Sequence, residues 1–132
     1  MITIPLSLLA CHFLSDFILQ SDWMATNKSK NWLALLWHVS VYSLPFFFLI
    51  AWLTLDPNKA GFFWMATFIS HFLTDAVTSR ITSKLWFFRP NPIIPTLWEP
   101  SGGNRHYFFV MIGLDQLIHF WTLAWTYNLL IK

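Results

Sequence analysis

A histidine and an aspartate stand four positions apart at three places in the chain, each time within a strongly apolar segment. The pairs are His12 with Asp16 in CHFLSDF, His71 with Asp75 in SHFLTDA, and Asp115 with His119 in LDQLIHF. Because a spacing of four places both side chains on one face of a helix, each pair can act as a unit. Random placement of these residues would give about 0.4 such pairs. Ionisable groups are costly in membrane-like segments and usually mark function there.

Imidazole and carboxylate groups together are typical ligands of zinc, manganese and iron. A fourth apolar segment adds His38, so the candidate metal ligands are His12, Asp16, His38, His71, Asp75, Asp115 and His119. Seven are too many for one tetrahedral zinc, so we expect one or two divalent ions, zinc foremost, or aspartates that orient histidine ligands. A metal with an open position turns bound water into a hydroxide nucleophile, and Asp16 is the candidate catalytic base.

The composition indicates a membrane protein. Hydrophobic residues make up 56% and charged residues 11% of the 132 residues, whereas soluble domains carry about a quarter charged residues. The length allows one domain, residues 1–132. The net charge of +2 and the lack of a basic stripe argue against a nucleic-acid partner. Membrane lipids are the expected partners, and an assembly of identical chains stays open.

Four apolar stretches approach the ~20 residues that a membrane-spanning helix needs. They cover residues 2–20, 32–55, 60–77 and 107–131. Pro45 predicts a kink in the second stretch, and DPNKAG, with its Pro and Gly, predicts a turn before the third. The expected fold is therefore all-α, an antiparallel bundle of four transmembrane helices with a Pro-rich connection between the third and the fourth.

The charges of the connections predict how the bundle is oriented. Two connections on one side carry six basic residues: Lys28, Lys30, Arg80, Lys84, Arg89 and Arg105. Because Lys and Arg gather on the cytoplasmic side, we expect a multi-pass protein of the bacterial inner membrane with both termini outside the cytoplasm.

The order within the pairs reverses with the direction of the helix. Histidine comes first in the first and third stretches, which run toward the cytoplasmic side, whereas Asp115 precedes His119 in the fourth, which runs away from it. Each aspartate therefore lies one turn nearer the cytoplasm than its histidine, and His38 lies at a similar depth. A single site shared by the four helices explains this reversal.

A site in the cytoplasmic leaflet favours hydrolysis of an ester or phosphoester in a lipid or lipid-linked substrate. The candidate substrate-binding residues are one amide and four cations that could hold an anionic head group: Gln20, Arg80, Lys84, Arg89 and Arg105. The connection 89–106 could close over the site as a lid. Two other classes stay open: a proton or metal transporter or channel that uses the same cluster, and a non-catalytic membrane factor whose metal is structural.

The segments HFLSDFILQSDWMATNK, NWLALLWHVSVY, SHFLTDAVTSRI and LDQLIHF together resemble a domain-of-unknown-function family of small bacterial and phage membrane proteins. The resemblance covers nearly the whole chain and implies ten recurring positions: His12, Asp16, Gln20, Lys28, His38, His71, Asp75, Asp115, Gln116 and His119. The chain is also distantly similar to inner-membrane proteins labelled metal-dependent hydrolases, although it lacks their full set of motifs. That similarity favours hydrolysis without indicating a substrate.

Overall fold

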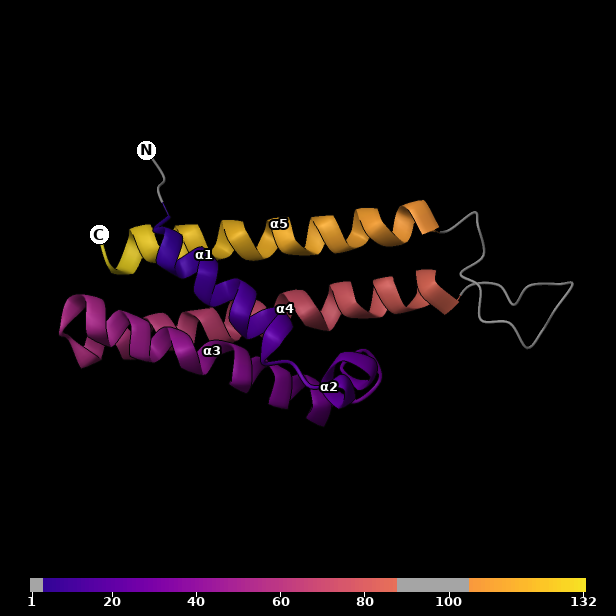
Figure 1. Cartoon of the computed structure of the whole chain (residues 1–132), viewed down its shortest axis with the longest axis horizontal. Coiled ribbons are helices and arrows are strands. Elements are labelled where there is room, and N and C mark those ends of the chain that lie inside the picture. Colours follow the sequence, from indigo (N-terminus) through magenta and orange to yellow (C-terminus); the bar gives the residue numbers. More distant parts are fainter. Residues whose placement is uncertain (1–3, 88–104) are drawn as a thin grey trace, which may run out of the picture.

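Every regular element that the structure describes is helical, which confirms the all-α prediction. This computed structural model describes residues 4–87 and 105–132. The elements are α1 (Leu6–Phe13), the π-helical turn η1 (Leu14–Ile18), α2 (Asp22–Asn27), α3 (Trp32–Thr54), α4 (Pro57–Phe87) and α5 (Arg105–Leu130). In Figure 1, α3, α4 and α5 run along the long axis of the molecule, and α1 crosses them obliquely.

The first apolar stretch forms a shorter helical segment than predicted. Helix α1 and η1 together cover Leu6–Ile18, about 20 Å at 1.5 Å per residue, which is less than the roughly 30 Å of a bilayer core. The segment ends where the Leu19 N–H donates to the Leu14 carbonyl at 2.9 Å. Helix α2, which the sequence did not predict, follows because Ser21 caps it and accepts from the Met24 N–H.

Helix α4 begins earlier than predicted, so the predicted start at residue 60 was wrong, and at its other end the helix continues past residue 77 to Phe87. The Asp56 carboxylate accepts from the N–H groups of Asn58 and Lys59 at 2.9 and 3.2 Å. Asp56 thus caps the helix, and Pro57 takes its first position, where the missing N–H costs nothing. DPNKAG therefore begins a helix, and the turn contracts to Leu55, whose φ is 53°, and Asp56. At the other end, the helix continues to Phe87 because no Pro or Gly between Thr78 and Phe87 interrupts it.

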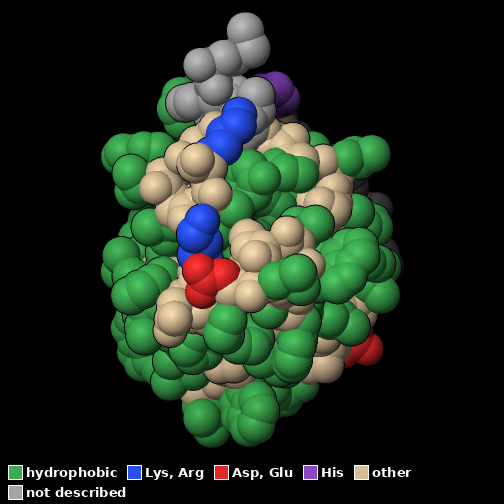
Figure 2. All heavy atoms as spheres, turned by 90° about the vertical axis from the view of Figure 1, so that its left-hand side faces the viewer, with side chains coloured by type: hydrophobic (Ala, Val, Ile, Leu, Met, Phe, Trp, Pro, Cys, Tyr) green, Lys and Arg blue, Asp and Glu red, His purple; other side chains and the backbone are tan. Residues whose placement is uncertain are grey.

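Within the described residues, two helices are long and apolar enough to cross a membrane. They are Trp32–Thr54, which continues through Pro45, and His106–Leu130. Two helices thus meet the criterion by length and composition, and four membrane-spanning helices are not confirmed, since α1 is short and α4 carries many polar residues. The surface is nonetheless strongly apolar. Large exposed hydrophobic side chains occur on α1, α3, α4 and α5, and Figure 2 shows that they dominate one end of the bundle.

The apolar core fills the end of the bundle near the turn between α3 and α4. Its buried residues come from four helices: Leu8, Tyr42, Phe46, Ile50, Ala60, Phe63 and Leu123. Tyr42 lies at the boundary of this core, and its hydroxyl faces the histidines. The bundle is therefore divided along its axis into an apolar part and a polar part.

Candidate metal centre

The polar part brings all seven predicted ligands together. Five of them are at most 2% exposed, Asp16 is 5% exposed, and the Asp115 side chain is 18% exposed. Close contacts connect them across α1, η1, α3, α4 and α5, as the shared depth and the reversed order of the pairs predicted. Buried carboxylates and imidazoles need partners or a cation, so this cluster is the strongest candidate for a functional site.

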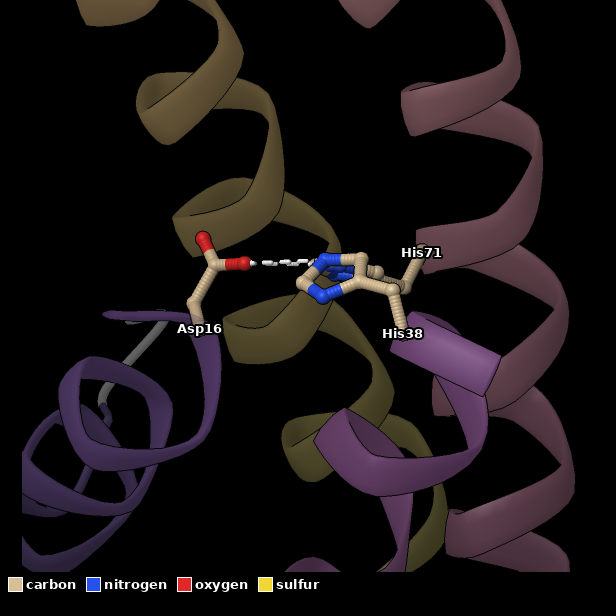
Figure 3. A group of neighbouring side chains, drawn as sticks. All are labelled: Asp16, His38 and His71. Carbon is tan, nitrogen blue, oxygen red and sulfur yellow. Dashed lines mark hydrogen bonds and ion pairs between the residues drawn. The ribbon is translucent and has the colours of Figure 1, made fainter. Parts of the chain in front are cut away.

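One group that could hold a metal ion comprises Asp16, His38 and His71. Figure 3 shows the Asp16 carboxylate from η1 facing both imidazole rings. Asp16 Oδ1 lies 3.2 Å from His38 Nε2 and 3.6 Å from His71 Nε2, and the two Nε2 atoms are 3.0 Å apart. Two ligand atoms of a tetrahedral ion with bonds of about 2.0–2.1 Å stand about 3.3–3.4 Å apart. The triangle therefore has the size of one face of such an ion.

A second group shares His71 and adds Asp75 and His119. Asp75 Oδ1 lies 3.1 Å from His119 Nε2, and Asp75 Oδ2 lies 3.7 Å from His71 Nε2. The rings of His71 and His119 stack with their centroids 4.1 Å apart. The two groups share His71 Nε2, which can bind only one ion at a time, so a second ion would need other ligands of the cluster.

Pairwise hydrogen bonds do not account for the environment of His38 Nε2. This one nitrogen has Lys28 Nζ, Asp16 Oδ1, Asp75 Oδ2 and His71 Nε2 between 3.0 and 3.2 Å away. An imidazole nitrogen offers one direction only, either an N–H or a lone pair. Potential ligand atoms of three residues therefore converge on one region together with the Lys28 ammonium, an arrangement that suits cations.

His12 and Asp115 belong to neither group, and their assignment as ligands stays a prediction. His12 Nε2 donates to Gln116 Oε1 at 2.9 Å, and His12 Nδ1 accepts from the Tyr42 hydroxyl at 2.8 Å. The amide of Gln116 in turn donates to Asp16 Oδ2 at 3.0 Å and to Asp115 Oδ2 at 3.2 Å. His12 and Gln116 thus fix the orientation of the Asp16 carboxylate.

Local structure explains how Asp16 reaches the centre. It lies within η1, and π-helical turns, which are rare, are frequent at functional sites. His12 Nε2 and Asp16 Oδ2, the two members of the HxxxD pair, are 3.9 Å apart, beyond hydrogen-bonding distance. Asp16 instead contacts His38 and Gln116, residues of other helices.

Reasoning from the residues alone missed Lys28 and Gln116, although the family resemblance included both. Lys28 directly follows α2, and its Nζ donates to Asp75 Oδ2 at 2.8 Å. Burial opposes the charged form of this amine, but the carboxylates of Asp75 and Asp16 outweigh burial and raise the pKa of Lys28. The side chain therefore brings a positive charge into the cluster at neutral pH.

A cavity of about 440 Å³ opens beside the cluster, between the α2 corner and the ends of α4 and α5. The carboxylates of Asp16, Asp75 and Asp115 line it. Hydroxyl groups also line it, together with the apolar side chains of Phe17, Phe108 and Ile112. A small group that enters this cavity would therefore reach the carboxylates of the centre.

Of the predicted substrate-binding residues that the structure describes, only Gln20 lies at the cavity. Gln20 lines the cavity, and its Oε1 is buried without a hydrogen-bond partner in the described part of the chain. The Arg80 guanidinium instead lies over the Trp32 ring, 4.0 Å from its centroid, and Lys84 is exposed outside the cavity lining. Arg89, most of the connection 89–106 and the side chain of Arg105 lie outside the described residues.

Comparison with known families identifies the chain. A family model described as a protein of unknown function (DUF3307) matches residues 4–132, so the chain belongs to this family. The predicted family type, a domain of unknown function, is thereby confirmed. Neither a curated protein nor a solved structure matches the chain.

Proposed function

We propose that this DUF3307 protein is a membrane-embedded, metal-dependent hydrolase acting on an ester or phosphoester of a lipid or lipid-linked substrate at the cytoplasmic leaflet. The observation that carries the proposal is the cavity lined by Asp16, Asp75 and Asp115, members or neighbours of the two groups suited to a metal. A purely structural metal needs no such access. Zinc fits the mixed imidazole and carboxylate ligands, and manganese or iron would fit them too.

Each part of the site has a task in this proposal. His71, Asp75 and His119, with His38, would hold the ion, which lowers the pKa of a water toward neutrality and so supplies a nucleophile. Asp16 lines the cavity and is held by the Gln116 amide. It is therefore placed to accept a proton, as a general base must be. Gln20, with its unpaired carbonyl, would receive a donor from the substrate or from water.

The cavity also supports an amphiphilic substrate. Phe17 is 47% exposed and borders the cavity, so an acyl chain could lie against it while a polar head group faces the carboxylates. The surface of the helices is apolar enough to face lipid directly.

Transport through the same cluster is the main competing function. A pathway needs polar groups along the whole bundle, whereas the core beyond Tyr42 consists of buried apolar side chains such as Phe46, Ile50 and Phe63. We therefore favour a hydrolytic reaction at the cluster over transport across the membrane.

The proposal is tested with purified protein in detergent on a panel of lipid esters and phosphoesters. Asp16→Asn should abolish turnover while leaving metal partly bound, and His71→Ala should remove both. Asp56→Asn, at the opposite end of the bundle, is the matched control, because asparagine also caps helices, and it should keep full activity. Proton or metal flux in liposomes without hydrolysis would establish transport instead. Neither flux nor hydrolysis in metal-loaded protein would leave a structural role.

A further inference from the structure

Lys28 occupies a position inside the cluster that a cation would take. Its Nζ lies 2.8 Å from Asp75 Oδ2, a member of one candidate metal group, and 3.2 Å from His38 Nε2, a member of the other. It therefore stands between the two groups, in contact with one potential ligand of each. The side chain is 18% exposed and lines the cavity, so it enters from the same side as a solute would.

The charges of the cluster favour a single divalent ion beside this ammonium. Asp16, Asp75 and Asp115 contribute three negative charges and Lys28 one positive charge, which leaves two negative charges when the histidines are neutral, as metal ligands must be. One divalent ion balances these two charges. Two such ions would leave an excess of two positive charges in a buried region, which is costly.

We propose that the Lys28 ammonium serves as the second cation of a two-cation centre, so that the protein binds one divalent ion per chain. The inference rests on the proposed metal site and specifies that this site holds one metal ion. In two-metal hydrolases, a second ion about 3.5–4 Å from the first stabilises charge that develops on the substrate. Here a lysine at the edge of the cavity is placed to hold an anionic ester or phosphate group in that role, close to Asp75.

The chemistry of lysine suits this role. Its compact ammonium is a point charge on a flexible stem, so it can stay near Asp75 or turn toward an anion in the cavity. Lys28 follows a short capped helix, and its own N–H donates to the Met24 carbonyl, so the backbone from which it extends is fixed. The alternative is that Lys28 only anchors the α2 corner to α4 through its ion pair with Asp75. An anchor would affect stability without changing the number of ions bound.

The first test counts ions in the unaltered protein. After saturation with Mn²⁺ or Zn²⁺ and dialysis, elemental analysis should give one ion per chain, and the electron paramagnetic resonance spectrum of the Mn²⁺ form should be that of an isolated ion. Two ions per chain, or a spin-coupled pair, overturns the inference even if the protein hydrolyses its substrate. Protein without any metal overturns both the inference and the proposed function.

The second test removes the ammonium. Lys28→Met should raise the number of bound ions from one to two, because the ligand atoms near Nζ become free and a positive charge is lost. Lys28→Arg should keep one ion, and Lys59→Met, which alters an exposed lysine at the other end of the bundle, should also keep one. If folded Lys28→Met still binds one ion with unchanged affinity, Lys28 is only an anchor. If Lys28→Met does not fold, the ion count and spectrum of the unaltered protein decide.

Discussion

Substituting Asp75 tests how strongly the charges of the cluster depend on one another. Its carboxylate is 2% exposed and faces Lys28 Nζ at 2.8 Å, His119 Nε2 at 3.1 Å and His38 Nε2 at 3.2 Å. Asparagine keeps the shape of the side chain but removes its charge, so the Lys28 ammonium loses its close carboxylate. Breaking a buried ion pair by removing one partner costs about 3–5 kcal/mol. We expect Asp75→Asn to lower the free energy of unfolding by that amount.

The double variant separates this charge effect from lost packing. Lys28→Met alone leaves Asp75 with its three histidine neighbours, so it should cost less than Asp75→Asn. When both residues are changed, no buried charge of the pair is left unpaired. The combined loss should therefore be smaller than the sum of the two single losses by at least about 1 kcal/mol.

The assay is a denaturant titration in mixed micelles with a chelator present, so that metal binding does not contribute to stability. Asp56→Asn combined with Lys28→Met is the control, because Asp56 caps the start of α4 at the opposite end of the bundle, and the effects of distant substitutions should add. A loss below about 1 kcal/mol for Asp75→Asn, or additive losses for the pair with Lys28, would refute the reasoning.

Three further results follow from the structure. His71→Ala should abolish metal binding, and retention of the ion by this variant in elemental analysis would contradict the assignment. Metal binding to the unaltered protein should weaken as the pH falls, because protons compete with the metal for the imidazole nitrogens. Phe46→Ala should cost about 3–5 kcal/mol of unfolding free energy through the cavity it leaves, with no change in bound metal, and loss of the ion would show that the apolar core and the centre are coupled. Tyr42→Phe should cost about 0.5–1.5 kcal/mol, because His12 Nδ1 loses its hydroxyl partner; an unchanged midpoint in the same titration would show that this hydrogen bond contributes nothing.

The cluster could be predicted from the sequence because each His/Asp pair is recognised from residues only four positions apart. Helical spacing places His71 and Asp75 one turn apart, and the reversed order in Asp115 and His119 reports an antiparallel neighbour. Both features depend on chain direction and helix period alone, so they survive errors in the helix bounds. The start of α4, in contrast, was predicted wrongly. Pro and Gly in DPNKAG usually indicate a turn, but here Asp56 caps a helix that begins at Pro57.

The role of Lys28 depended on tertiary structure and could not be predicted from spacing. Its side chain reaches Asp75, a residue 47 positions away, because η1 ends at Ile18 and the short helix α2, which packs against α3, then turns the chain back toward the bundle. Neither a π-helical turn nor a six-residue helix has a periodic pattern that the sequence displays. The same holds for the Gln116 amide, whose partners Asp16 and His12 lie about a hundred residues away.

The polar part of the bundle lowers the stability of the fold, because it buries polar groups that lack hydrogen-bond partners. Within the described residues, Nδ1 of His38, Nδ1 of His71 and Oε1 of Gln20 are buried without hydrogen-bond partners. Each such group costs about 1–3 kcal/mol, and well-packed apolar side chains in place of buried charges are often neutral or stabilising. A bundle selected for stability alone would extend the core of Phe46 and Phe63 through this region. Histidines, aspartates and a lysine are found there instead, beside a cavity, which supports the proposed binding of a ligand at this place.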